Sequence, residues 1–138
     1  MLAFKRGFIM LCNDRTESEC LERNLFGDLA KRFQELDEIQ TGDIGLLLNI
    51  NRDELIGIFR ACSPAQLHIE PDAWKGKFAA QVCVEPVGEL HRVTDAAYIL
   101  KKAGVGTRLA SSGALVPQFP VHGRDTIENI LAYFNQKD

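Results

Sequence analysis

Two apolar runs joined by a short polar connection are the feature that most constrains the fold of this chain. The runs cover residues 44–50 (IGLLLNI) and 55–62 (LIGIFRAC), and residues 51–54 (NRDE) separate them. Short apolar runs bounded by turn-forming residues are typical of buried strands, and a connection of this length is typical of a β-hairpin. The sequence therefore predicts an antiparallel hairpin over residues 44–62.

Further strands are predicted on both sides of this hairpin. Residues 7–12 form a short apolar run closed by Asn-Asp, and alternate residues of 78–85 are apolar, which places them on one face of a strand. Residues 104–120 are rich in Gly, Ser and Pro, so we expect a largely irregular segment with one short strand at 114–116. The total is about five strands, mostly antiparallel and arranged as a barrel.

Helices are predicted between and after these strands. Residues 16–19 (TESE) match a capping box, which indicates a helix after the first strand. Helical character returns at residues 94–102, and apolar residues recur at helical spacing in 127–134. The sequence thus predicts a single α+β domain over residues 1–138, a mostly antiparallel β-barrel with helices packed outside.

The composition excludes some classes of protein. Hydrophobic residues make up 46% of the chain, and the formal net charge is -3, so a protein that coats nucleic acid through its phosphates is not expected. A local phosphate site stays compatible with this charge. No apolar run approaches the roughly 20 residues that span a bilayer, and the apolar residues 8–12 are interpreted as a strand rather than a signal peptide.

The cysteines and histidines give no catalytic or metal-binding pattern. Cys12, Cys20, Cys62 and Cys83 contain no C-x-x-C pair, and we expect four buried thiols in a reduced, cytoplasmic protein. The three histidines lack the spacing of metal ligands to one another or to any cysteine. We therefore predict no metal, no cofactor and no enzymatic activity.

The signals for ligand binding are stronger. Trp74 is the only tryptophan and lies beside Lys75 in a polar loop, where it is either a stacking surface or a lid over one end of the barrel. Asn13 directly follows the first strand, so its amide either reads a ligand edge or shapes the turn into the helix. Phe26 precedes a glycine, and core packing is the simpler interpretation of it.

Two charged residues near the C-terminus allow two interpretations. Asp125 begins the motif DTIE, whose spacing is that of a capping box. The same carboxylate is also able to accept a hydrogen bond from a ligand, and the neighbouring Arg124 is able to hold a phosphate in a fork.

Five segments, in order along the chain, resemble the development and cell death (DCD) domain: residues 7–13 (GFIMLCN), 25–27 (LFG), 57–64 (GIFRACSP), 69–74 (IEPDAW) and 78–82 (FAAQV). Ala79 stands where that family usually has proline, and Val87 in the motif PVGE stands for a leucine. The resemblance implies an association with stress and cell-death responses in plants, and it implies no assigned ligand.

More distantly, the chain is similar to YTH and EVE domains, which share a PUA-like barrel. The run 72–78 (DAWKGKF) and the motifs FPV and GRD near the C-terminus carry this similarity. YTH domains read N6-methyladenine with an aromatic cage. By matching motifs, Phe26 and Trp74 fall at cage walls, Asn13 and Asp125 at polar contacts to the base, and Ile69 replaces a further cage tryptophan.

We therefore expect a non-enzymatic binding domain with a partly aromatic pocket. Its ligand is predicted to be a nucleobase or modified base in single-stranded RNA or DNA, or a nucleotide-like molecule. The predicted ligand contacts are Asn13, Phe26, Ile69, Trp74 and Asp125, and the predicted phosphate contacts are Lys75 and Arg124. One alternative is a protein-interaction module of a stress-signalling protein, and another is an enzyme acting on a base, for which Cys12 is the nearest nucleophile in the sequence.

Overall fold

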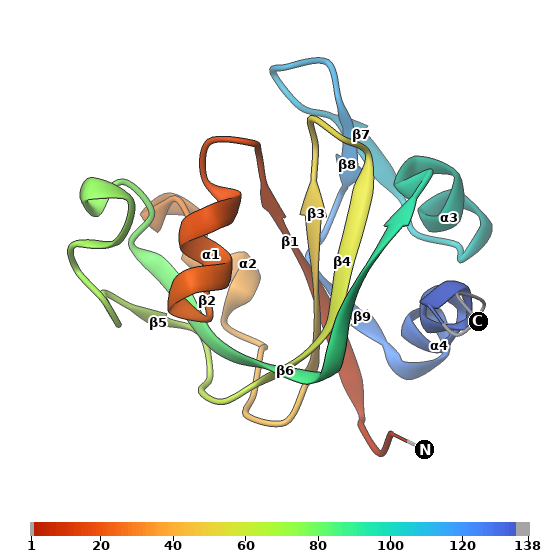
Figure 1. Cartoon of the computed structure of the whole chain (residues 1–138), viewed down its shortest axis with the longest axis horizontal. Coiled ribbons are helices and arrows are strands. Elements are labelled where there is room, and N and C mark those ends of the chain that lie inside the picture. Colours follow the sequence, from red (N-terminus) through yellow and green to blue (C-terminus); the bar gives the residue numbers. More distant parts are fainter. Residues whose placement is uncertain (1, 135–138) are drawn as a thin grey trace.

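The computed structural model describes residues 2–134 as an α+β fold built on a curled sheet (Figure 1). Its strands are β1 (Arg6–Cys12), β2 (Leu25–Asp28), β3 (Ile44–Asn49), β4 (Glu54–Ala61), β5 (Gln66–Leu67), β6 (Ala80–Thr94), β7 (Thr107–Leu109), β8 (Leu115–Pro117) and β9 (Val121–Gly123). Its helices are α1 (Glu17–Arg23), α2 (Phe33–Leu36), α3 (Ala96–Lys102) and α4 (Arg124–Phe134), with short 3-10 turns η1 (Ala30–Arg32) and η2 (Ala73–Gly76).

The main sheet is mixed and mostly antiparallel. Its strand order is β2-β6-β4-β3-β1-β9, and β5 also pairs with β6. Only β1 and β3 run parallel, while β3 and β4 form the predicted hairpin. The long strand β6 bends, so that its first four residues pair with β2 and β5 and its part from Val84 to Thr94 pairs with β4 (Figure 1). The sheet thereby curls into a half-barrel, which confirms the predicted fold class.

Both faces of the central strands are buried, which explains why their sequences are continuously apolar. In β1, Phe8 and Met10 join an inner cluster together with Phe26 and Phe59, while Ile9 joins an outer cluster. α1 and α2 lie on one side of β1, β3 and β4, and α3 and α4 lie on the other (Figure 1). The buried face of α4 is the predicted one, made of Ile127, Ile130, Leu131 and Phe134.

The local structure differs from the sequence-based expectation in three places. Residues 104–120, expected to be largely irregular, contain the hairpin of β7 and β8. The capping box at Thr16 does not form, because Thr16 makes no side-chain cap and Glu19 binds a distant backbone N–H group. α4 begins at Arg124, so Asp125 lies inside its first turn rather than before it.

The cysteines are not four thiols. Cys62 and Cys83 form a disulfide with their Cα atoms 5.2 Å apart, whereas Cys12 and Cys20 are free and buried. A sequence separation of 21 between Cys62 and Cys83 hid this pairing, because only the antiparallel approach of β4 and β6 brings the two together. The prediction of four thiols is therefore wrong for this pair.

The helices are short. The longest of those that the structure describes, α4, has 11 residues. Within residues 2–134, no helix has the length and apolarity that crossing a bilayer requires.

Candidate ligand-binding site

A small cavity of about 130 Å3 opens at the end of β1, between α1, β2 and the loop that carries Trp74. Its walls combine the face of one tryptophan with two thiols, one amide and one carboxylate. The lining residues are Leu11, Cys12, Asn13, Thr16, Cys20, Gly27, Asp28, Ile50, Trp74 and Phe78. Segments far apart in the sequence therefore meet at one place.

Asn13 both shapes the chain and faces this cavity. Its side-chain oxygen accepts hydrogen bonds from the backbone N–H groups of Arg15, at 2.9 Å, and Thr16, at 3.1 Å. Its own backbone N–H donates to the Thr16 hydroxyl at 3.0 Å. These bonds make Asn13 the residue that turns β1 into α1. This is the structural one of the two roles that the sequence suggested for it. Within residues 2–134 its side-chain NH2 group makes no hydrogen bond, so this donor is available to a ligand.

Trp74 is a wall of the cavity and is held by two hydrogen bonds. Its backbone N–H donates to the Glu19 carboxylate at 2.8 Å, and its indole Nε1–H donates to the carbonyl oxygen of Thr16 at 3.3 Å. The indole is only 7% exposed and meets the Phe78 ring edge-on, with centroids 5.6 Å apart. The backbone N–H and the ring N–H of Trp74 are thus both hydrogen-bonded, which fixes the position of the indole in the cavity wall.

The loop that presents Trp74 is tied to the sheet by a buried glutamine. The side chain of Gln81 is 1% exposed in β6. Its Nε2 donates to the carbonyl oxygens of Glu70, at 3.1 Å, and Phe78, at 2.9 Å, and its Oε1 accepts from the Glu70 N–H at 2.7 Å. Arg23 of α1 adds an ion pair to Glu70 at 2.6 Å. The loop is therefore pre-organised rather than free to move with the ligand.

A second buried amide fixes the other side of the cavity. Asn49, which is fully buried at the end of β3, donates to the carboxylates of Asp14, at 3.1 Å, and Glu17, at 2.9 Å. Its Oδ1 accepts from two backbone N–H groups of the following turn, at 2.9 and 3.2 Å. A hydrogen bond from Arg92 is the main cause that holds the pKa of Glu17 below its usual range. Every hydrogen-bonding position of Asn49 is thus used to hold the connection between β1 and α1 in place.

Asp28 is a site residue that the sequence analysis missed. It follows the motif LFG directly in β2, and an aspartate after a glycine is typical of ordinary turns, so nothing in the sequence indicated a binding role. Its carboxylate accepts from the Leu29 N–H at 2.7 Å and lies 3.2 Å from the Arg32 guanidinium. Burial nevertheless raises the pKa of Asp28 above its usual value. Among the described residues that line the cavity, it is the only charged one.

The two free thiols at the cavity are unsuited to nucleophilic catalysis. Burial raises the pKa of Cys12, and it raises the pKa of Cys20 to about 12. Both thiols are therefore protonated near neutral pH, and the thiolate is the reactive form. In the described part of the chain, no group of three or more His, Cys, Asp or Glu side chains is arranged to hold a metal ion.

Three of the predicted contacts stay outside the cavity. Phe26 is fully buried and packs edge-on against Phe59, with ring centroids 4.9 Å apart, so it belongs to the inner cluster. Ile69 is partly buried against the same cluster. Lys75 is exposed on the loop next to Trp74. Strand alternation explains Phe26, because β2 turns this ring inward while its next residue, Gly27, lies under Trp74.

Arg124 and Asp125 lie at the far end of β1. The register pairs Gly123 with Arg6 at the start of β1, whereas Asn13 follows the end of that strand. Six residue steps of about 3.3 Å separate the two ends by roughly 20 Å. A single pocket that combines Asp125 with Asn13 and Trp74 is therefore not formed, and this part of the prediction is corrected.

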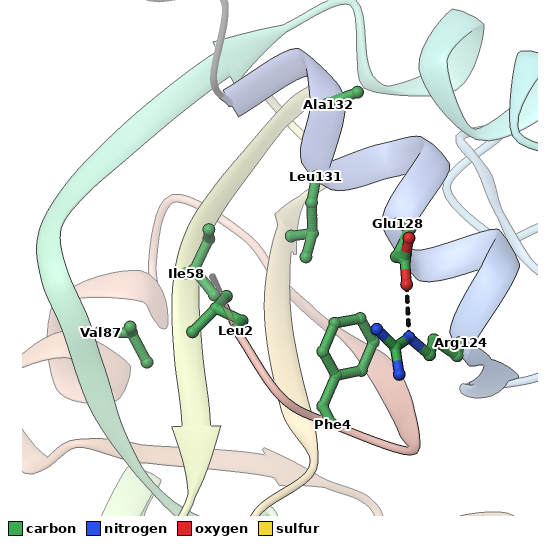
Figure 2. Close-up of a pocket in the computed structure, with 8 residues that line it drawn as sticks. All are labelled: Leu2, Phe4, Ile58, Val87, Arg124, Glu128, Leu131 and Ala132. Atoms are coloured by element: carbon green, nitrogen blue, oxygen red, sulfur yellow. Dashed lines mark hydrogen bonds and ion pairs between the residues drawn. The ribbon is translucent and has the colours of Figure 1, made fainter.

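A larger cavity of about 630 Å3 lies on the outer side of the sheet, between β6 and α4 (Figure 2). Figure 2 shows Ile58 and Leu2 at its centre, Leu131 and Ala132 on α4, and Val87 on β6. At one end, the guanidinium of Arg124 lies 5.5 Å from the Phe4 ring centroid and pairs with Glu128. The Arg124 and Glu128 side chains are each 50% exposed, so this cavity offers apolar walls and no buried polar group to read a base.

Comparisons with known proteins agree with this architecture. The sequence model of the development and cell death domain matches residues 6–99. The chain is 40% identical over 88 residues to the DCD domain-containing protein NRP-A of Glycine max; the match covers 56% of this chain and 23% of that protein's length.

Solved structures with the same fold include YTH domains. The Pho92 YTH domain in complex with m6A superposes with a TM-score of 0.67 at 12% identity, over 100% of this chain and 90% of that one. The YTH domain of Zygosaccharomyces rouxii MRB1 in complex with N6-methyladenosine RNA superposes with a TM-score of 0.66 at 11% identity, over 100% of this chain and 94% of that one. At these identities the likeness establishes the fold alone.

Proposed function

This chain belongs to the development and cell death domain family, and from that premise we propose that it binds one nucleobase, plain or modified, in its small cavity. The nucleobase belongs to single-stranded RNA or DNA or to a free nucleotide. The protein acts by binding and performs no reaction.

The observation that carries this proposal is a fixed aromatic face beside an available amide donor. Trp74 supplies the stacking surface and Asn13 supplies an NH2 group without a partner among the described residues. A cavity of about 150 Å3 accepts a benzene-sized ring, so a cavity of about 130 Å3 suits the inserted edge of one base and not a whole nucleotide. The YTH domains with the same fold, described in complex with N6-methyladenosine, support this class of ligand.

The charge of the chain indicates how tightly such a ligand binds. A net charge of -3 gives no general attraction to phosphates, although Lys75 is exposed beside the cavity. Stacking on an aromatic side chain contributes about 1–3 kcal/mol per base. We therefore expect modest affinity with a shallow dependence on salt, because few counterions are released.

Tryptophan fluorescence tests the proposal directly, because Trp74 is the only tryptophan. Nucleosides, including N6-methyladenosine, and short single-stranded RNA and DNA are titrated, and we expect saturable quenching by at least one of them. The diagnostic variant is Asn13→Asp, which keeps the oxygen that turns β1 into α1 and removes the NH2 donor. We expect it to weaken binding while Asp125→Ala, about 20 Å away, leaves binding unchanged.

A second candidate function is a protein-interaction module, and the β7–β8 hairpin favours it. Leu109 and Leu115 are direct partners in that hairpin, and they are 68% and 48% exposed. Adjacent exposed leucines are typical of a contact surface. If no nucleic-acid ligand quenches Trp74 in the folded protein, this candidate becomes the better explanation.

A further inference from the structure

We infer that the small cavity selects bases that carry an exocyclic amine, and that Asp28 is the residue that recognises the amine. This inference rests on the proposed function and names the class of base. It follows from counting which polar groups of the cavity are still able to form a hydrogen bond.

The donors of the cavity reduce to one strong group. The Thr16 hydroxyl already accepts from the Asn13 N–H at 3.0 Å and lies 3.2 Å from the Asn13 side-chain oxygen. Cys12 and Cys20 stay protonated and are weak donors. The NH2 group of Asn13 therefore remains as the donor for a ligand.

Asp28 is the corresponding acceptor. An ionised carboxylate has about four lone-pair positions and no donor. The Leu29 N–H and the Arg32 guanidinium occupy part of this capacity. Asp28 also lines the cavity, and we assign its remaining lone pairs to a molecule bound there. A ligand that fits the cavity therefore needs a hydrogen-bond donor facing Asp28 and an acceptor facing Asn13, together with a flat ring that stacks on Trp74.

Amino-bearing bases meet this requirement. Cytosine and adenine each carry an amine next to a ring nitrogen that accepts a hydrogen bond, and guanine carries its amine next to the acceptor N3. Uracil carries one ring N–H between two carbonyl oxygens, so directing that N–H at Asp28 also brings carbonyl oxygens toward a carboxylate. Hypoxanthine, the base of inosine, has a carbonyl where adenine has its amine. The carboxylate therefore favours the amine and disfavours the carbonyl.

Matched pairs of nucleosides test this inference. Trp74 quenching is measured with cytidine against uridine and with adenosine against inosine, each pair differing in an amine and a carbonyl. One hydrogen bond to a charged group predicts about 10- to 100-fold tighter binding of the amino-bearing member. Asp28→Asn is nearly isosteric and its amide both donates and accepts, so we expect the ratio to fall toward one.

The ion pair of Asp28 with Arg32 requires a separate control. Arg32→Gln removes the same ion pair and keeps the carboxylate, so we expect the preference for the amine to survive in it. Equal binding of cytidine and uridine, or an unchanged ratio in folded Asp28→Asn, overturns the role of Asp28 and leaves the proposed function standing. Absence of binding by every nucleoside overturns both.

Discussion

The contact between Gly27 and Trp74 gives the sharpest prediction about the site. A Cβ atom built on Gly27 lies 2.4 Å from Cζ3 and 2.8 Å from Cη2 of the Trp74 indole, and 3.0 Å from Cβ of Phe78. Ordinary contacts of a Cβ atom lie at 3.4–4 Å, so the indole has to move by about 1 Å or more in Gly27→Ala. The indole has little freedom to move, because its backbone and its Nε1 are both hydrogen-bonded.

The expected magnitude follows from two opposing effects. Overpacking a well-packed site costs about 1–3 kcal/mol, while replacing glycine by alanine gains about 0.4–1 kcal/mol by restricting the unfolded chain. Gly123→Ala is the matched control, because Gly123 also lies in a strand and a Cβ there meets nothing within 4 Å. The difference between the two variants isolates the steric cost, so we expect Gly27→Ala to be less stable than Gly123→Ala by about 1–3 kcal/mol.

Urea unfolding and acrylamide quenching of Trp74 measure this prediction together. Gly27→Ala is expected to unfold at lower urea and to expose Trp74 more to the quencher, and Gly123→Ala is expected to match or slightly exceed the natural chain in stability. Equal stability and equal quenching in the two variants would refute the packing of the indole on Gly27. It would also remove the argument that this indole is a fixed wall of the cavity.

Two of the three further predictions concern groups that hold the site in place, and the other concerns His122 of β9, at the opposite end of β1. Asn49→Asp replaces two donors by a carboxylate facing Asp14 and Glu17, and we expect a loss of about 2–4 kcal/mol in urea unfolding at neutral pH. Burial lowers the pKa of His122 below its ordinary value of 6.5. The neutral imidazole therefore contributes stability above pH 6.5, and this contribution is lost as the pH falls through the pKa of the folded state. Unfolding midpoints measured across this pH range are expected to depend less on pH in His122→Gln. Arg23→Gln removes the ion pair to the Trp74 loop, and limited proteolysis is expected to cut residues 68–79 faster, whereas an unchanged cleavage rate contradicts the role of Arg23 in holding the loop.

Apolar runs predicted the central strands correctly, whereas local polar motifs predicted elements but not the partners of their polar groups. Continuous apolar runs predicted β1, β3 and β4, because strands buried on both faces need no alternation. The capping motif at Thr16 predicted a helix at the right place for a partly wrong reason. α1 does begin there, but the Glu19 carboxylate accepts the Trp74 N–H across 55 residues. A local motif marks an element without showing which partner its polar groups finally take.

In the candidate site too, local patterns indicated some residues, and others depended on the tertiary structure. Asn13 and Trp74 were recognisable as candidates because an amide at a strand end and a lone tryptophan in a polar loop each allow a binding role beside a structural one, and both line the cavity. Asp28 was not recognisable, since an aspartate after a glycine is typical of ordinary turns. The separation of Asp125 from Asn13 depended on β9 pairing with the start of β1, a register that no local pattern contains.

The sequence by itself determined the strands β1, β3 and β4, the helices α1, α3 and α4, the mostly antiparallel α+β class, and the family to which the chain belongs. These properties follow from hydrophobic period and local motifs, which act over a few residues. Only the tertiary structure decided that Phe26 points into the core, that Asp28 joins the cavity, and that Cys62 pairs with Cys83. Those outcomes depend on strand register and on the bend of β6, where a shift by one residue turns a side chain to the opposite face.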